Sequence, residues 1–396
     1  MTQEEQLQII RRGTIEIIGE SEILERIKAG RILRVKLGVD PTAKDVTLGW
    51  AVVLRKLRDF QKMGHIACLI IGDFTALIGD PTGKSKTRKQ LTREEVQANV
   101  EAVSKQFFRI LDPAKTEIYY NKDWLGKMGF EDVIRLCSRY TVARIMERDD
   151  FTKRFTNHEP IAMHEILYPL CQGMDSVEIK SDIEIGGNDQ KFNNLVGRTL
   201  MEQYGLEPQA VVLCPLLVGT DGKEKMSQSL GNYISITDDP NTMFGKTMSI
   251  PDETIANWFE LCTDVPMNEV AEMMSEGKNP RDAKMRLGRE IVALYHSEAE
   301  ADAAVQFFVN TFSQRKVVTE AEDAAIPESV VFDGSVSIPS LVVALGLAAS
   351  NGKVKDLISA GAIALDGEKV TSLSMPQAEL VGKILKVGKH QFRKLV

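Results

Sequence analysis

Short strand-like runs alternate with helical stretches through the first half of the chain, and this alternation limits the possible folds more than any other feature. The runs lie at 32–39, 66–71, 117–120, 182–185 and 211–218. Strands separated by helices are typical of a parallel sheet that helices cover on both faces. We therefore expect an α/β fold with a doubly wound parallel sheet, which binds its ligands at the carboxyl ends of the strands.

A loop rich in Asp, Pro, Thr and Gly joins the first of these strands to a helix-like run at 51–63. The loop and its flanks, residues 38–50, read GVDPTAKDVTLGW. Backbone N–H groups at a helix start carry partial positive charge, and glycine lets a base or a phosphate approach the main chain closely. This segment indicates a nucleotide site.

A second segment, residues 223–232, reads KEKMSQSLGN and follows the apolar run 211–218. Ammonium and hydroxyl donors in such a loop suit a polyphosphate, because they can surround the charge that develops when a phosphoryl bond breaks. Taken alone, the segment is equally compatible with a solvated turn that carries two lysines.

A candidate substrate face lies between the two segments. Tyr168, Gln172 and Asp175 are spaced i, i+4, i+7 and share one face of a helix, unless Pro169 kinks it. A phenol, an amide and a carboxylate suit a pocket for a polar aromatic substrate, although a helix with a mixed polar face is the alternative. The next segment, IEIGGNDQ at 183–190, ends a short strand in two glycines and allows main-chain contact with a ribose.

These segments resemble those of a known enzyme family. TLGW at 47–50 and KMSQS at 225–229 are similar to the HIGH and KMSKS motifs of class I aminoacyl-tRNA synthetases. With Tyr-x-x-x-Gln-x-x-Asp and Gly-Gly-Asn-Asp-Gln added, nearly the whole chain resembles the tyrosyl-tRNA synthetases. The resemblance implies that tyrosine and ATP give tyrosyl-adenylate, and that the tyrosyl group then passes to the terminal adenosine of tRNA(Tyr). Mg²⁺ would accompany the ATP, with no metal held by the protein alone.

The resemblance also implies roles for individual residues. Tyrosine would be bound by Lys36, Asp40, Asp80, Tyr168, Gln172, Asp175 and Gln190, with the ammonium at Asp80, Tyr168 and Gln172 and the ring hydroxyl at Asp175. ATP would be bound by Asp40, Thr42, Gly49, Trp50, Gly186, Asp189, Lys225 and Met226. Catalysis would use Thr42, Thr47, Gln190, Lys225 and Gln228.

Both signature motifs depart from the family pattern. Thr47 and Trp50 replace the two histidines of the first motif, and Gln228 replaces the second lysine of the other. These side chains still donate hydrogen bonds but carry no charge. The missing charge could come from Lys223 or from a basic run made of Lys84, Lys86, Arg88 and Lys89. Lys36 stands where some relatives have a tyrosine that contacts the substrate ring.

Two other functions remain open at this point. A tryptophanyl-tRNA synthetase shares the fold, but does not account for the polar face of Tyr168, Gln172 and Asp175 or for a basic C-terminal domain. A synthetase-like RNA-binding protein without adenylation activity would explain the departures at Thr47 and Gln228.

Positive charge is concentrated at the C-terminal end. From Ser337 onward, eight Lys/Arg against four Asp/Glu give +4, which leaves −11 for the rest of a chain whose total is −7. Localised positive charge is expected where a protein contacts phosphates, although a solvated basic tail is the alternative. A helix pair at 340–347 and 354–360 and a strand at 362–365 resemble the small RNA-binding fold named for the fourth protein of the small ribosomal subunit. Candidate RNA-binding residues are Lys353, Lys355, Lys383, Lys386, Lys389 and Arg393.

A length of 396 residues predicts two or three domains. We expect a catalytic domain at 1–237 with an insertion at about 130–160, a helical anticodon-binding domain at 238–319, a flexible linker at 320–336 and an RNA-binding domain at 337–396. The resemblance also implies a homodimer formed through the insertion. The N-terminus lacks the pattern of a signal peptide, and five cysteines without Cys-x-x-Cys spacing fit a reducing cytoplasm.

Overall fold

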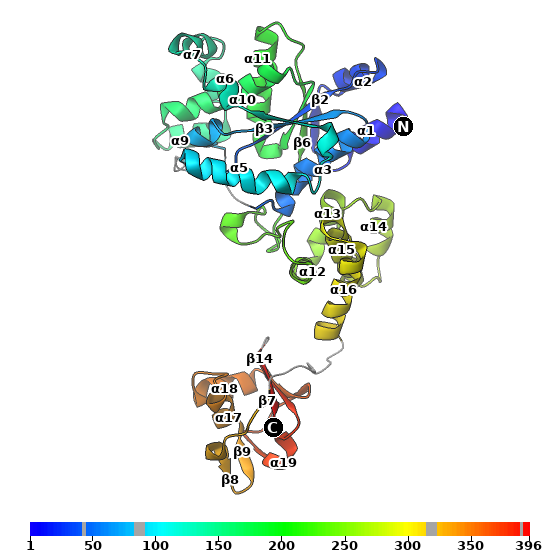
Figure 1. The fold of residues 1–396 in the computed structure, drawn as a ribbon, viewed down its shortest axis with the longest axis vertical. Coiled ribbons are helices and arrows are strands. Elements are labelled where there is room, and N and C mark those ends of the chain that lie inside the picture. The colour runs from blue at the N-terminus through cyan, green and yellow to red at the C-terminus, as the bar shows by residue number, and fades with distance from the viewer. Residues whose placement is uncertain (42–44, 83–91, 314–322, 389–390) are drawn as a thin grey trace. The chain divides into compact units, whose positions relative to one another are not determined.

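The computed structural model describes residues 1–41, 45–82, 92–313, 323–388 and 391–396 (Figure 1). The described chain divides into two compact units, residues 1–302 and 303–396. No helix in these described ranges is long and apolar enough to cross a membrane.

A six-stranded sheet forms the centre of the first unit, with strand order β1-β6-β5-β2-β3-β4. Its strands are β1 (Glu16–Ile18), β2 (Arg34–Val39), β3 (Ile66–Ile71), β4 (Thr116–Tyr120), β5 (Ile183–Gly187) and β6 (Ala210–Cys214). All neighbouring pairs are parallel except β1 with β6. β6 is apolar and buried throughout, as a sheet covered on both faces requires. The doubly wound sheet predicted from the sequence is confirmed, and its switch point lies between β2 and β5.

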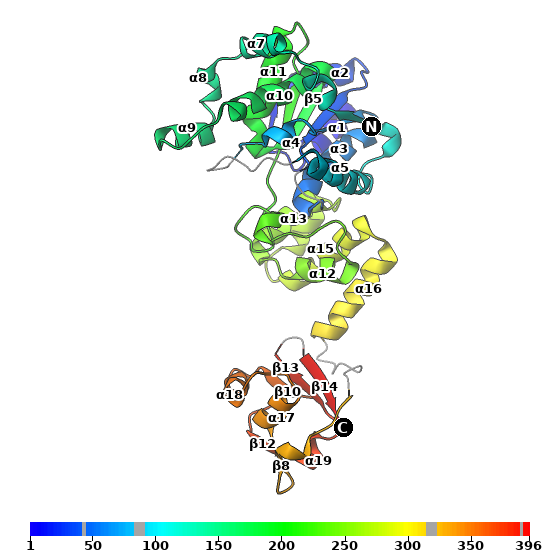
Figure 2. The same ribbon diagram turned by 60° about the vertical axis from the view of Figure 1, so that its left-hand side comes forward.

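Helices pack on both faces of this sheet. Figures 1 and 2 show α3 (Leu48–Lys62) and α5 (Arg93–Phe107) on one side, and α10 (Met163–Ile179) and α11 (Lys191–Gln203) on the other. The remaining helices around the sheet are α1 (Gln3–Arg11), α2 (Glu20–Lys28), α4 (Thr75–Ile78) and α6 (Lys122–Leu125). α10 runs through Pro169 as one element, so the proline does not break the substrate face predicted on it.

Residues 130–160 form three short helices between β4 and α10, namely α7 (Phe130–Cys137), α8 (Val142–Ile145) and α9 (Asp149–Thr156). Ile145 and Phe151 are buried in one core cluster with Leu170 of α10. A buried ion pair also joins Arg154 to Glu165 at 2.6 Å, with side chains only 3% and 2% exposed. Apolar packing and this ion pair therefore fasten the insertion to the helix that carries the predicted substrate face.

A helical bundle follows the sheet and completes the first unit. It consists of α12 (Pro240–Met248), α13 (Ile255–Cys262), α14 (Met267–Met273) and α15 (Pro280–Tyr295), and α16 (Glu298–Phe308) then crosses the boundary between the units. Phe244, Trp258 and Phe259 are fully buried in it. Gly288 lets α15 approach α12 closely, since a Cβ at Gly288 would lie 2.9 Å from the ring of Phe244 on α12. Trp258 also donates from Nε1 to the carbonyl of Val218 at 3.1 Å, which ties the bundle to the segment after β6.

The second unit is a small α+β fold. Its sheets have the strand orders β11-β10-β13-β14-β7 and β12-β9-β8. The strands are β7 (Asp323–Ala324), β8 (Val331–Phe332), β9 (Ser335–Ser337), β10 (Ile363–Leu365), β11 (Glu368–Lys369), β12 (Ser374–Pro376), β13 (Ile384–Val387) and β14 (Gln391–Leu395). The helices are α17 (Ile338–Ala344), α18 (Asn351–Ser359) and α19 (Gln377–Leu380). The helix pair and the strand predicted near residues 340–365 are confirmed, and the turn after the strand uses Asp366 and Gly367, both with positive φ.

Part of the linker predicted at 320–336 is instead structured. β7 pairs with β14, and β8 pairs with β9. Ile326 and Val330 are buried in the core of the second unit. The acidic, small-residue-rich composition hid these strands because each is only two or three residues long.

Candidate active site

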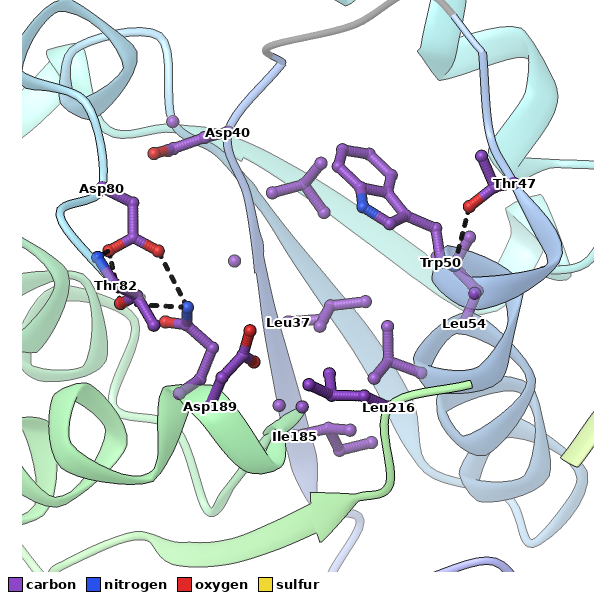
Figure 3. Close-up of a pocket in the computed structure, with 18 of the residues that line it drawn as sticks. Leu37, Asp40, Thr47, Trp50, Leu54, Asp80, Thr82, Ile185, Asp189 and Leu216 are labelled. Atoms are coloured by element: carbon purple, nitrogen blue, oxygen red, sulfur yellow. Dashed lines mark hydrogen bonds between the residues drawn. The ribbon is translucent and has the colours of Figure 1, made fainter. Parts of the chain in front are cut away.

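A cavity of about 710 Å³ opens where β2 and β5 end, at the switch point of the sheet. Most of the residues predicted as ligands line it, although they come from segments far apart in the chain (Figure 3). They are Asp40, Thr47, Gly49, Trp50, Asp80, Tyr168, Gln172, Asp175, Gly186, Asp189, Gln190, Lys225, Met226 and Gln228. Thr42 and the basic run Lys84, Lys86, Arg88 and Lys89 lie outside the described residues.

Asp40 is fixed at the end of β2 by two hydroxyl donors. The Tyr168 hydroxyl donates to Oδ2 of Asp40 at 2.7 Å, and Thr75 donates to Oδ1 at 2.7 Å. Burial, followed by the charge of Asp40, raises the pKa of Tyr168 well above its usual value, so the phenol keeps its proton. Gly72 makes this arrangement possible, because a Cβ there would lie 2.0 Å from Oδ1 of Asp40.

Asp175 lies buried on α10 and accepts from two side chains. Trp124 donates from Nε1 to Oδ1 at 2.9 Å, and Asn121 donates from Nδ2 to Oδ2 at 3.4 Å. Burial raises the pKa of Asp175 to about 7, although Lys36 and the two donors oppose the rise. This carboxyl group is therefore buried, and a further hydroxyl donor from a ligand would be strongly favoured there.

Lys36 does not reach the cavity, contrary to the prediction that it binds tyrosine. Its side chain is fully buried and forms an ion pair with Glu184 at 2.9 Å. Nζ also donates to Oγ of Ser176 at 2.8 Å and to the Gln172 carbonyl at 3.0 Å. A buried ammonium needs such partners, and no sequence pattern predicts that Glu184 supplies one.

Asp80 and Gln190 both line the cavity and are hydrogen-bonded to each other. Gln190 donates from Nε2 to Oδ2 of Asp80 at 2.8 Å. Thr82 donates to Oδ1 of Asp80 from both its backbone N at 2.9 Å and its hydroxyl at 2.6 Å (Figure 3). The predicted ammonium ligand and the predicted carboxylate-orienting residue therefore belong to one hydrogen-bonded group.

The first motif forms the start of α3. Thr47 is the N-cap, and its Oγ1 accepts from the Trp50 backbone N at 3.3 Å. The hydroxyl proton of Thr47 remains available as a donor. Figure 3 shows the Trp50 indole projecting into the cavity on the same side as Thr47, opposite Asp80.

The second motif lies on a short hairpin. The strand predicted at 211–218 ends at Cys214, because Pro215 has no N–H to continue the ladder. The chain then turns back through a bridge between Val218 and Lys225. Asn232 holds the loop by accepting from the Ser227 backbone N at 2.9 Å and donating to Asp221 at 2.8 Å.

The two motifs touch each other. The Gly49 backbone N lies 3.3 Å from Sδ of Met226, and Gln228 donates from Nε2 to the Asp45 carbonyl at 2.5 Å. The amide of Gln228 therefore joins the two loops. Lys225 pairs with Asp189 at 3.1 Å in a half-exposed contact. Such surface pairs contribute little, so a phosphate could replace Asp189 as the partner of Lys225 at small cost.

Charge is unevenly distributed around the cavity. Among the described lining residues, Lys225 is the single cation. The carboxylates are Asp40, Asp45, Asp80, Asp175, Glu184 and Asp189. The carboxylates of the lining therefore suit an ammonium group, whereas a polyphosphate bound in the same cavity needs further positive charge. Gly186 at the end of β5 meets the Asn194 side chain so closely that a Cβ would lie 2.6 Å from it, in keeping with a glycine that keeps the cavity open.

Those predicted RNA-binding residues that the structure describes are spread over α18 and the β13–β14 pair of the second unit. Lys353 and Lys355 are exposed on α18, two positions apart, and point to different sides of the helix. Lys386 lies over the Phe392 ring at 5.7 Å on the β13–β14 pair. Arg393 lies opposite the buried Leu385 in the strand register, so its side chain is on the other face of these strands from Lys386. Lys383 is half-buried just before β13, and Lys389 lies outside the described residues.

Several residues at the site were not predicted from the sequence. They are Gly72, Thr75, Thr82, Asn121, Trp124, Arg148, Glu184 and Asn193. The only local signal was at Gly72, where a glycine directly follows an apolar strand. Thr82 and Asn193 contact the nearby Asp80 and Gln190, two and three positions away, whereas the others contact side chains far away in the sequence, which no spacing rule connects.

The chain is similar to known proteins of one family. A family model described as class I tRNA synthetases (W and Y) matches residues 28–313. The chain is 50% identical to the tyrosine–tRNA ligase of Carboxydothermus hydrogenoformans, over 99% of this chain and 97% of that protein. It is 48% identical to the tyrosine–tRNA ligase of Thermotoga maritima, over 100% of this chain and 98% of that protein.

A solved structure shares the fold. The tyrosyl-tRNA synthetase of Archaeoglobus fulgidus, solved in complex with L-tyrosine, superposes with a TM-score of 0.63 at 22% identity. The match covers 77% of this chain and 100% of that one.

Proposed function

The chain belongs to the class I tRNA synthetases of the tryptophan and tyrosine family, and from this premise we propose that it attaches L-tyrosine to tRNA(Tyr). The first step forms tyrosyl-adenylate and pyrophosphate from tyrosine and ATP. The second passes the tyrosyl group to a ribose hydroxyl of the terminal adenosine of the tRNA. The observation that carries the proposal is the buried Asp175 on α10, which lines the same cavity as the two nucleotide motifs.

Asp175 accounts for the choice of tyrosine. The ring hydroxyl of the substrate would donate to its carboxylate beside Trp124 and Asn121. Phenylalanine has no such hydroxyl and would leave a buried carboxylate without that donor, a rule for which tyrosyl-tRNA synthetases are the standard example. An indole N–H, in contrast, would have to reach the same carboxylate from a larger ring.

Acyl activation needs positioning rather than a general base. A carboxylate with a pKa of about 3.5 is already ionised at neutral pH and can attack the α-phosphorus in line. Gln190 and Asp40 would orient the amino acid, while Thr47, the Gly49 N–H and Lys225 would donate to the phosphates. Gly186 and Asp189 would contact the ribose. Thr42, with the basic run at 84–89, would complete the phosphate site.

Magnesium would enter with the nucleotide. The cavity has many carboxylates and one described cation, so the phosphates of ATP need added positive charge. Mg²⁺ commonly binds substrate phosphates and few protein ligands. The free cysteines, four of them buried, are consistent with a reducing cytoplasm as the place of reaction.

We also propose that two chains associate through the insertion. Large apolar side chains are exposed there, including Phe130 at 81% and Phe155 at 69%, with Ile134 and Val142 also exposed, as is Met163 at the start of α10. Large apolar side chains that are exposed to water in one region are typical of association sites. Assembly into a homodimer would remove these side chains from water.

Amino-acid-dependent exchange between pyrophosphate and ATP tests the proposal. With Mg²⁺ present, we expect exchange with tyrosine alone among the twenty amino acids, and none in Asp175→Ala. Exchange with tryptophan would identify a different synthetase, and binding of tRNA without any exchange would identify an RNA-binding protein. Lys355→Met, on the surface of the second unit, serves as the control for exchange, because it lies outside the unit that holds the cavity.

A further inference from the structure

Arg148, in the insertion between α8 and α9, reaches the wall of the amino-acid cavity. Its Nη2 donates to Oγ1 of Thr82 at 2.8 Å, and its Nη1 donates to Oδ1 of Asn193 at 3.2 Å. Asn193 donates to Oε1 of Gln190 at 3.0 Å. Since Gln190 and Thr82 both donate to Asp80, the five side chains form a closed circuit of hydrogen bonds, here named the Arg148 ring.

The ring determines how Asp80 faces the cavity. Its Oδ1 accepts from the N and the hydroxyl of Thr82, and its Oδ2 accepts from Gln190. A carboxylate has about four acceptor positions, so these three bonds leave about one for a ligand. The direction of that remaining position follows from the other three. Asn193 is buried and holds Gln190 in turn.

Arg148 is paired more closely with Asp150 than with Asp80. Asp150 accepts from Nε at 2.8 Å and from Nη2 at 3.1 Å, a two-pronged pair that is almost fully buried. Asp80 itself lies 3.8 Å from Nη2, with the Thr82 hydroxyl bonded to both. The guanidinium also stacks over the Phe151 ring at 5.0 Å. One cation between two carboxylates leaves the group with net negative charge, which Asp80 can offer to an ammonium.

We propose that Arg148 is a positioning residue for amino-acid binding, which through the Arg148 ring aims Asp80 at the ammonium of the substrate. The inference rests on the proposed function, because it takes the amino acid as the ligand of Asp80. Arg148 touches no part of the substrate. The planar guanidinium suits this task, since it can hold Thr82, Asn193 and Asp150 in fixed directions at once, which the single ammonium of a lysine cannot do.

Two small phenols isolate the contribution of the ammonium. Tyramine and 4-ethylphenol differ only in that tyramine carries the amino group. Their dissociation constants are measured by calorimetry with the full-length protein. The dissociation constant of 4-ethylphenol divided by that of tyramine is a ratio that reports the ammonium contact. In Arg148→Met we expect this ratio to fall roughly tenfold, the usual effect of disturbing a hydrogen bond to a charged group. The binding of 4-ethylphenol, which depends on Asp175, should stay unchanged.

Matched variants separate positioning from loss of structure. Arg144→Met removes an exposed arginine of the same insertion, which pairs with the nearby Glu147, and should leave the ratio as in the wild type. Arg148→Lys should lower the ratio nearly as much as Arg148→Met. Asp80→Asn should remove most of the ammonium contribution, and adding Arg148→Met to it should cause little further loss.

Kinetics of the exchange reaction give a second test. The KM for tyrosine in the exchange reaction should rise in Arg148→Met while the KM for ATP stays constant. An unchanged tyramine ratio, or equal weakening of tyramine, 4-ethylphenol and ATP, would overturn the inference. If Arg148→Met does not fold, Thr82→Val opens the ring at a half-buried position, and the same ratio decides. Absence of tyrosine-dependent exchange in the wild type would instead contradict the proposed function.

Discussion

At the scale of single residues, Asp175 shows how burial sets the chemistry of recognition. Desolvation raises its pKa to about 7, and Lys36 beneath it limits that rise. The carboxyl group is therefore close to half-protonated at neutral pH in the free protein. A phenol that donates to it would favour the ionised form, so binding of tyrosine and loss of the Asp175 proton are coupled.

This coupling predicts a pH dependence. As the pH falls through about 7, Asp175 takes up a proton and becomes a weaker acceptor, so kcat/KM for tyrosine should decrease on the acid side. Below the pKa the decrease should approach tenfold for each pH unit. Exchange kinetics from pH 5.5 to 8.5 measure it.

Asp175→Asn provides the control, because an amide does not titrate. The variant should bind tyrosine more weakly and should lose the acid limb. A wild-type profile that is flat between pH 6 and 8 would contradict the assigned pKa shift. The profile of 4-ethylphenol binding should follow that of tyrosine, since both present the same hydroxyl.

At the scale of helices and strands, the junction of α9 with α10 depends on a buried charge pair. Glu165 accepts from Arg154 at 2.6 Å and from the Ala162 backbone N at 2.9 Å, where it closes the first turn of α10. Removing one member of a buried pair leaves the other charge without compensation. The cost is about 3–5 kcal/mol of unfolding free energy.

We therefore expect Arg154→Met to lower the free energy of unfolding by about 3–5 kcal/mol, as measured by denaturant titration. The double variant Arg154→Met with Glu165→Gln should recover much of the loss, because no buried charge remains. The exposed pair of Arg135 with Glu131 is the matched control, and Arg135→Met should change stability by less than about 1 kcal/mol. Equal changes in the free energy of unfolding at both sites would show that burial does not increase the contribution of the pair of Arg154 with Glu165.

The elements also show what the sequence could and could not predict. Strands such as β3 and β6 were predictable because buried parallel strands are continuous apolar runs. The face of Tyr168, Gln172 and Asp175 followed from helical spacing alone. The partner of Lys36 could not be predicted, since Glu184 meets it only after β2 and β5 pair side by side. Two-residue strands such as β7 carry too little pattern to be recognised.

At the scale of the whole molecule, the exposed apolar side chains of the insertion predict the assembly state. We expect light scattering of the purified protein to give twice the chain mass of 44.0 kDa. Phe155→Asp places a charge in the proposed contact and should shift the protein toward the single-chain mass. Phe332→Asp, equally exposed at 68% but in the second unit, should leave the mass unchanged.

The hairpin that carries the KMSQS segment is anchored at both ends, and this determines how Lys225 can move. Trp258 fastens Val218 to the buried centre of the bundle, and Asn232 closes the other end of the loop. Gly222 and Gly231, both with positive φ, lie between these fixed ends. Between these ends, the bridge to Val218 and the amide of Asn232 hold the backbone of Lys225. The lysine can therefore exchange Asp189 for a phosphate by rotating its side chain alone, and the main chain of the catalytic unit can stay still while it does so.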